Sequence, residues 1–220
     1  MGNRTRTIKA GLLAMLIVIG LGIEHGKAHA AETEVLTVAG GCFWCVEADF
    51  EKVEGVIEAV SGYTGGNVKN PTYKEVTRGG TGHYEAVEIR FNPKKVSARQ
   101  LYDLFFRSVD PLDAGGQFCD RGESYRTAIF VSDTAQKQAA EAAKAKAEKE
   151  LGKAVVTPIL KAGAFYEAED YHQDYYKGEK LILTRFGPKT QASAYERYRD
   201  ACQRDERVRD LWGQDAPFVN

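Results

Sequence analysis

Two cysteines three positions apart, Cys42 and Cys45, are the residues best suited to chemistry in this sequence. They lie in the stretch GGCFWC, residues 40–45, between a segment rich in Val and Thr and a segment with helical periodicity. Backbone N–H groups at a helix N-terminus stabilise a thiolate, so we expect a helix start here to lower the pKa of Cys42. The pattern indicates a redox-active pair, with a metal site or two structural disulfides as the alternatives.

The supply of ligands argues against the metal site. A closed zinc site needs a tetrahedral set of Cys and His ligands. Beyond residue 30 the only other candidates are Cys119 and Cys202, which stand alone, and His83 and His172. No second C-x-x-C and no H-x₃₋₅-H follows residue 30, so we expect no metal.

A glutamate on the apolar face of a strand is the second chemical signal. In residues 83–91, Val87, Ile89 and Phe91 alternate onto one face, and Glu85 falls on the same face. Burial penalises the charged carboxylate and raises its pKa, which suits a proton donor near neutral pH. The alternative is a glutamate at a strand end that reaches solvent or an arginine partner.

The elements that would position these residues follow from periodicity and turn residues. Strands are predicted at residues 34–39, 56–63, 83–91, 125–131 and 155–160. The last is predicted at a sheet edge because Pro158 cannot donate to a ladder. Helices are predicted from Cys42 to about Gly55, after a capping box at residues 97–100, from a cap at Asp133 to about residue 151, and over 195–211.

The order of these elements predicts the fold class. The first four strands and two helices run β-α-β-β-α-β, the split βαβ order. We therefore expect an α+β, two-layer sandwich with a ferredoxin-like core elaborated by long loops. The two long loops, residues 67–82 and 110–122, are of a length that is usually functional.

The first thirty residues differ from the rest. Basic residues precede an apolar run over 10–23, and small residues follow at Ala28 and Ala30. This pattern predicts a signal peptide cleaved after Ala30, with export to the periplasm. An uncleaved anchor is the alternative, although the run is shorter than the roughly 20 residues of a membrane span. We expect residues 31–220 to form a single domain with a C-terminal tail from about residue 177.

Composition sets outer limits on partners. The chain has 220 residues, 43% of them hydrophobic and 28% charged, which is enough for one domain with a core of its own. The net charge is -1, so no basic footprint for nucleic acid is visible and no nucleic-acid partner is expected. We expect a monomer.

Six stretches, in order, resemble motifs of the peptide methionine sulfoxide reductase A family. They span about residues 35–176, and one such motif alone would be weak. The stretches are GCFWCVE (41–47), GYTGG (62–66), NPTYKEV (70–76), TGHYEAV (81–87), FCDRGESY (118–125) and AEDYHQ (168–173).

The resemblance implies an α+β enzyme that reduces the S epimer of methionine sulfoxide, free or in proteins, as part of protein repair under oxidative stress. It implies Cys42 as the nucleophile and Glu85 as the general acid that protonates the sulfoxide oxygen. The remaining implied roles are hydroxyl donors to that oxygen (Tyr73, Tyr125), a pocket for the terminal methyl group (Phe43, Trp44) and a supporting polar residue (Asp120).

The resemblance also implies a sulfenic acid at Cys42 that a second thiol converts to a disulfide. No prosthetic group is implied, only an external dithiol such as thioredoxin or a thioredoxin-like protein. Many family members carry Gly in place of Cys45 and place the resolving cysteine in a C-terminal tail. Three resolving candidates stay open here: Cys45 and Cys202 rank close together, and Cys119 ranks third.

Two other functions compete with this prediction. One is a thioredoxin-like disulfide oxidoreductase, which would reduce protein disulfides and not sulfoxides. The other is an exported, non-enzymatic binding module held by disulfides. An unusually acidic Cys42 would favour the reductase, whereas two closed disulfides would favour the module.

Overall fold

The computed structural model describes residue 2 and residues 33–184, 187–214 and 216–219. The chain divides into two units, residues 1–30 and 31–220, and the fold described here is that of the second. The predicted signal peptide lies outside the described residues, apart from Gly2. No helix in the described ranges is long and apolar enough to cross a membrane.

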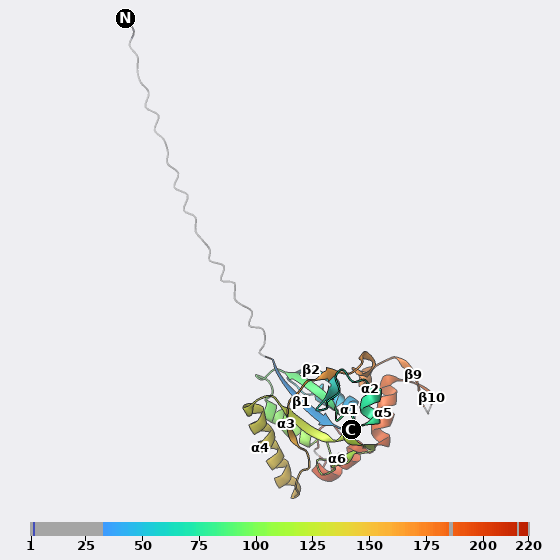
Figure 1. The fold of residues 1–220 in the computed structure, drawn as a ribbon. Coiled ribbons are helices and arrows are strands. Elements are labelled where there is room, and N and C mark those ends of the chain that lie inside the picture. Colours follow the sequence, from blue (N-terminus) through green and yellow to red (C-terminus); the bar gives the residue numbers. More distant parts are fainter. Residues whose placement is uncertain (1, 3–32, 185–186, 215, 220) are drawn as a thin grey trace. The chain divides into compact units, whose positions relative to one another are not determined.

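A six-stranded sheet, in the order β7-β6-β1-β3-β2-β8, forms the centre of the domain (Figure 1). Its four central strands are β1 (Glu34–Gly40), β2 (Val56–Thr64), β3 (Tyr84–Phe91) and β6 (Thr127–Val131). Each is antiparallel to its neighbour in the order β6-β1-β3-β2. This is the ferredoxin-like arrangement, so the predicted fold class is confirmed.

Two short strands extend the sheet at its edges. β7 (Ile159–Lys161) pairs in parallel with β6, and β8 (Tyr166–Glu167) pairs with β2. The predicted edge position of the strand that follows β6 is confirmed. Its predicted start at residue 155 is wrong, because the strand begins only after Pro158, whose ring nitrogen cannot donate to a ladder.

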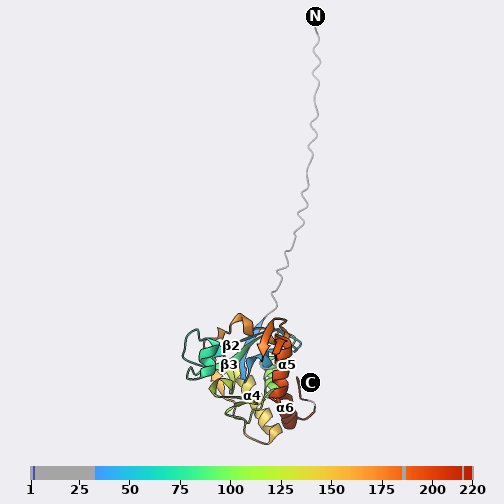
Figure 2. The ribbon, with the colours of Figure 1, turned by 90° about the vertical axis from the view of Figure 1, so that its right-hand side faces the viewer.

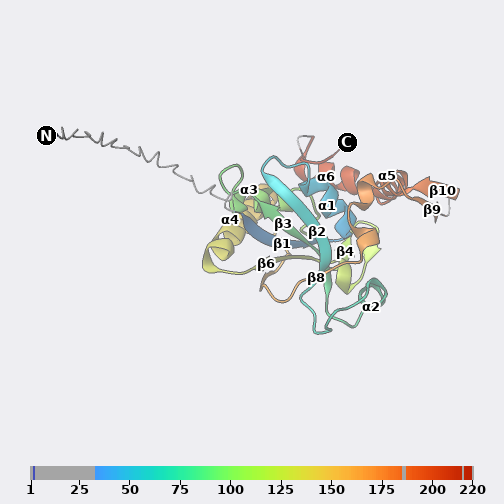
Figure 3. The same ribbon diagram turned by 90° about the horizontal axis from the view of Figure 1, so that it is seen from above.

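Helices pack on one face of the sheet, and α1 (Phe43–Phe50) and α3 (Ala98–Phe106) lie together there (Figure 3). With α4 (Thr134–Leu151) they enclose the main core, which includes Leu36, Ile89 and Phe105, all at most 1% exposed. The predicted caps of α3 and α4 form: Ser97 pairs with Gln100 in a capping box, and Asp133 accepts from the Gln136 N–H. A smaller apolar cluster, around Ala128 and Phe130, lies on the opposite face.

Both predicted long loops contain elements that periodicity missed. Residues 67–82 hold α2 (Tyr73–Arg78), which begins with a capping box between Thr72 and Glu75. Residues 110–122 hold a hairpin of β4 (Gly116–Gln117) and β5 (Asp120–Arg121). Tyr125, predicted at the start of a strand, ends the one-turn helix η1 (Glu123–Tyr125) instead. These elements are too short for a period to show.

The C-terminal part folds against α1. It comprises the hairpin of β9 (Leu181–Thr184) and β10 (Gly187–Thr190), then α5 (Gln191–Ala201) and α6 (Arg204–Trp212), which follow one another along one side of the domain (Figure 2). The single helix predicted over 195–211 is wrong. Gln203 adopts the left-handed backbone conformation, with φ of 55°, and separates the two helices.

Candidate active site

The Cys42–Cys45 pair lies at the N-terminus of α1. Cys42 is the N-cap residue and Cys45 the third helical residue, and the Cys45 N–H donates to the Cys42 carbonyl over 3.1 Å. An N-cap side chain folds back over the third helical position, so this spacing places the two sulfurs together. Both are free thiols, only 7% and 2% exposed, and they interact with one another.

The predicted low pKa of Cys42 is wrong for this structure. Burial and the contact with Cys45 raise the pKa of Cys42 well above its ordinary value. The helix N–H that was expected to serve the thiolate, that of Phe43, instead donates to Glu85 Oε2 over 3.1 Å. The contact with Cys42 lowers the pKa of Cys45 to about 7, so Cys45 is the thiol of the pair that ionises more readily.

Glu85 lies on β3 beneath the start of α1 and is 1% exposed. The side chains of Val87, Ile89 and Phe91 on the same face are fully buried, which rules out the solvent-exposed alternative. Burial raises the pKa of Glu85 to about 8, so its carboxyl is protonated at neutral pH. Its Oε2 accepts from the Phe43 N–H, whereas its Oε1 makes no such bond among the described residues and is the oxygen available to the proton; the carboxyl also interacts with the Tyr125 hydroxyl.

Tyr73 and Tyr125 reach this site from the two long loops. Tyr73 is the first residue of α2, and Tyr125 is the last residue of η1. Burial raises the pKa of both phenols, and Tyr125 interacts with Tyr73 and with Glu85. Both hydroxyls therefore stay protonated and can donate hydrogen bonds to an oxygen placed between them and the carboxyl.

One small cavity of about 60 Å³ brings the predicted site residues together. A cavity of this size admits a small group at the end of a side chain and excludes a folded chain. Its lining comprises Cys42, Phe43, Trp44, Tyr73, Glu85, Asp120, Tyr125 and Tyr198. Every residue on this list except Tyr198 was predicted from the sequence.

The aromatic wall of the cavity is held by residues that the prediction left without a role. The Trp44 ring stacks on Tyr175 with centroids 3.8 Å apart, and its Nε1–H donates to His172 Nδ1 over 3.1 Å. Glu169 accepts from the Tyr63 hydroxyl at 2.9 Å and from the Tyr73 N–H at 3.0 Å. Both His172 and Glu169 belong to the stretch AEDYHQ, which was the one sequence signal that could have identified them.

Tyr198 closes the cavity from α5 and was also missed. Its hydroxyl donates to the Asp120 carboxylate, and its ring meets the edge of Trp44 with centroids 6.2 Å apart. Burial raises the pKa of Asp120. The only sequence signal was its position one helical turn before Cys202.

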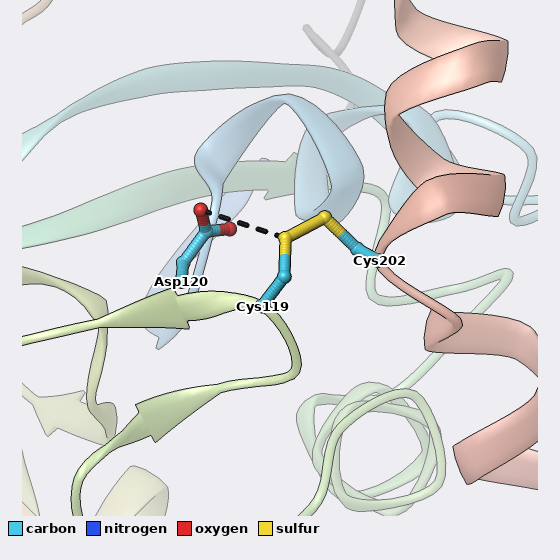
Figure 4. Close-up of side chains that lie close together, drawn as sticks. All are labelled: Cys119, Asp120 and Cys202. Atoms are coloured by element: carbon cyan, nitrogen blue, oxygen red, sulfur yellow. Dashed lines mark hydrogen bonds between the residues drawn. A yellow bond between two sulfur atoms is a disulfide. The ribbon is translucent and has the colours of Figure 1, made fainter.

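Cys119 and Cys202 are bonded to each other, with Cα atoms 4.9 Å apart (Figure 4). The bond joins the β4–β5 hairpin to the junction of α5 and α6. Asp120 Oδ1 lies 3.9 Å from the Cys119 sulfur, and the bond lines a second pocket of about 460 Å³ together with Lys189 and Arg197. Of the three candidate resolving thiols, Cys45 is therefore the one in the free state and the one beside Cys42.

A buried thiol pair, a protonated carboxyl and two hydroxyl donors around one small cavity define a thiol-dependent reductase on an α+β sandwich. Residues 34–210 match the family described as peptide methionine sulfoxide reductase, and the chain belongs to this family. It is an enzyme of that class.

Relatives and solved structures agree with this assignment. A peptide methionine sulfoxide reductase MsrA 2 from Rhizobium meliloti is 46% identical over 189 residues, which covers 86% of this chain and 88% of the relative. An MsrA from Bacillus subtilis is 47% identical over 182 residues, covering 82% and 96%. The crystal structure of reduced Mxr1 from Saccharomyces cerevisiae has a TM-score of 0.64 and 31% identity, covering 67% of this chain and 86% of that one.

Proposed function

We propose that this reductase acts on the S epimer of methionine sulfoxide, free or in proteins, with Cys42 as nucleophile. One observation carries the proposal: a thiol, a protonated carboxyl and two phenols line a single cavity of about 60 Å³. The aromatic wall of Phe43 and Trp44 suits a methyl group by shape and apolar contact. The opposite wall suits an oxygen that gains charge as the sulfur is attacked.

In the first step the sulfoxide oxygen moves from the substrate sulfur to the sulfur of Cys42. Cys45, the thiol that ionises more readily, takes the proton of Cys42 as its thiolate. The Cys42 thiolate attacks the substrate sulfur while Glu85 donates a proton to the oxygen and Tyr73 and Tyr125 donate hydrogen bonds to it. The protonated oxygen then passes, as a hydroxyl group, from the substrate sulfur to the Cys42 sulfur as the bond between the two sulfurs breaks. Methionine leaves, reduced by two electrons, and Cys42 is left as a sulfenic acid, oxidised by two.

In the second step Cys45 resolves the sulfenic acid. The Cys45 sulfur attacks the Cys42 sulfur as it gives up the proton it took in the first step, the S–O bond breaks, and the oxygen leaves as water carrying that proton. The product is a Cys42–Cys45 disulfide. Cys45 is favoured because it is a free thiol in contact with Cys42, whereas Cys119 and Cys202 are bonded to each other.

An external dithiol returns the pair to the reduced state. The reaction needs two electrons per turnover, and a dithiol such as thioredoxin or a thioredoxin-like protein supplies them by disulfide exchange, without a prosthetic group. We further propose that the enzyme is exported, that the first thirty residues are removed after Ala30, and that it repairs oxidised proteins in the periplasm. The basic, apolar and small-residue pattern of residues 1–30 supports export, as does a closed Cys119–Cys202 disulfide.

Epimer-resolved turnover tests the proposed function. With dithiothreitol as reductant, the enzyme is expected to consume the S epimer of a methionine sulfoxide peptide and to leave the R epimer. Cys42→Ser should abolish turnover, while Ser193→Ala on α5 serves as a control outside the cavity. Reduction of insulin disulfides without any sulfoxide turnover would instead establish a disulfide oxidoreductase.

A further inference from the structure

Arg204, at the start of α6, is a buried cation that no carboxylate fully neutralises. Its side chain is 2% exposed. Its Nη1–H donates to the Gly40 carbonyl at 3.3 Å and its Nη2–H to the Ser108 carbonyl at 2.9 Å. Its Nε lies 3.9 Å from Asp49 Oδ2, and neither atom has a hydrogen-bond partner among the described residues.

The neighbouring buried arginine, Arg199, is fully paired with carboxylates, in contrast to Arg204. Arg199 on α5 donates to Asp49 Oδ1 and to Asp205, each over 2.8 Å, and to the Tyr195 hydroxyl over 3.0 Å. Oδ1 of Asp49 therefore accepts its hydrogen bond from Arg199 and not from Arg204. Burying an unpaired charge costs folding free energy, so we expect another anion close to Arg204.

The position of Arg204 identifies that anion. Gly40 precedes Cys42 by two residues, and Asp49 follows Cys45 by one helical turn on α1. The guanidinium thus lies against α1 at the redox pair, and the Phe118 ring covers it at 4.7 Å. Of the charged groups that act on Cys45, Arg204 lowers its pKa most strongly, after the larger effect of the contact with Cys42.

We propose that Arg204 is a positioning residue whose guanidinium is the fixed counter-cation for the Cys45 thiolate. The proposal rests on the proposed function only for what Cys45 does, namely accept the proton of Cys42 and then attack the sulfenic acid. It gives the C-terminal helices a role in the reaction that does not require a cysteine. The same cation stabilises the charged nucleophile before attack and is no longer needed once the neutral disulfide forms.

The other groups around the pair make such a counter-cation necessary. The carboxylate of Asp120 opposes a negative charge on Cys42, as does that of Glu85 once it has given up its proton, and the carboxyl group of Asp49 opposes one on Cys45. Arg199 is the second favourable charge, although two carboxylates already share it. The groups that face the pair are Asp49 on α1, Tyr73 on α2, Glu85 on β3, Asp120 on β5, Tyr175 on η3 (Tyr175–Lys177), Tyr195, Tyr198 and Arg199 on α5, and Arg204 on α6.

The test measures ionisation of Cys45 in the reduced, resting enzyme. Alkylation by iodoacetamide is followed across pH, and mass spectrometry of the peptides assigns the rate to each cysteine. Arg204→Met is expected to move the Cys45 midpoint upward by about one pH unit and to slow its alkylation at pH 7 roughly fivefold. Arg204→Lys, which keeps the charge, should restore most of the shift.

Two further variants keep the outcome decisive. Arg207→Gln, on the same helix but 44% exposed and paired with Asp110, is the matched control and should leave the midpoint unchanged. Asp49→Asn removes a nearby negative charge with little change of shape and should lower the midpoint, which tests the idea even if Arg204→Met fails to fold. A wild-type midpoint in folded Arg204→Met, or an unmoved midpoint in Asp49→Asn, would overturn the proposal.

These readouts use no sulfoxide, so they separate the inference from the proposed function. An enzyme without sulfoxide turnover that still shows the Arg204 shift would keep the counter-cation and discard the reaction. An enzyme that reduces sulfoxide but shows no shift of the Cys45 midpoint in Arg204→Met would keep the proposed reaction and discard the counter-cation.

Discussion

At the scale of single residues, the site depends on a protonated Glu85 carboxyl that faces the cavity. Glu85 can donate because burial raises its pKa from the ordinary 4.5 to about 8, and because Phe43 occupies only one of its two oxygens. Sequence alternation was enough to locate this carboxyl on the apolar face. It could not reveal which oxygen is free, since that depends on how the start of α1 packs over β3.

Glu85→Gln tests this proton donor. A positioned general acid contributes roughly 10²- to 10⁴-fold, so the variant should lose about that factor in kcat/KM while remaining folded. In the unchanged enzyme, kcat/KM should fall as the pH rises through about 8, where the carboxyl ionises. A variant that keeps more than a tenth of the activity would contradict the assignment.

The same substitution makes a prediction about stability. The folded-state pKa of Glu85 lies above its unfolded value, so its contribution to stability is fully present below about 4.5 and is lost as the pH rises through about 8. Glu85→Gln carries no carboxyl that must be buried in its charged form at high pH. The variant should therefore be more resistant to urea than the wild type at pH 9, and less resistant than the wild type at pH 5. If the wild type and Glu85→Gln differed in urea resistance by the same amount at pH 5 and pH 9, the carboxyl would not be buried in its protonated form.

The pKa of His172 is shifted in the opposite direction to that of Glu85. Burial lowers its pKa to about 4 from the ordinary 6.5, so the folded protein favours the neutral ring. Stability should therefore fall as the pH drops from about 6.5 to about 4. His172→Gln retains an acceptor for the Trp44 N–H and should flatten this part of the profile, as thermal unfolding across pH would measure. An unchanged slope would contradict the burial of a neutral ring.

At the scale of elements, the redox pair depends on the start of α1 and on the short elements that surround the cavity. The strand, the glycine turn and the helix around Cys42 follow from sequence pattern. The lowered pKa predicted for Cys42 failed because a helix N–H serves whichever acceptor packs against it, and here that is Glu85. Short elements such as α2 and the β4–β5 hairpin bring Tyr73 and Asp120 to the cavity, and their length is below any detectable period.

The Cys119–Cys202 bond tests which disulfide is catalytic. Replacing both residues with Ser opens a crosslink between positions 83 residues apart and should lower the free energy of unfolding by roughly 2–4 kcal/mol. Turnover with dithiothreitol should persist, because Cys42 and Cys45 remain. Chemical denaturation and steady-state kinetics check the two halves, and a sulfenic acid that accumulates without being resolved would assign resolution to Cys119 or Cys202.

At the scale of the whole molecule, the β-α-β-β-α-β order was sufficient to predict the sheet of β6, β1, β3 and β2. The contribution of the C-terminal part could not be predicted in the same way. It was expected as a tail, yet it places Tyr198 on the cavity and Arg199 and Arg204 beneath α1. Such contacts join residues more than a hundred positions apart, and no local pattern records them.

Export is a prediction about the whole chain. Expressed at full length in a bacterial host, the protein should accumulate in the periplasm with Ala31 as its first residue. N-terminal sequencing of the fractionated protein checks this. An N-terminus that still contains the apolar run of residues 10–23, in the membrane fraction, would favour the anchor instead.

The central claim is that Cys42 and Cys45 form the disulfide that closes each turnover. The most direct measurement is mass spectrometry of the enzyme after one turnover with methionine sulfoxide and no reductant. The predicted result is one equivalent of methionine, a new Cys42–Cys45 disulfide and an unchanged Cys119–Cys202 bond. A disulfide between Cys42 and either Cys119 or Cys202 would contradict it.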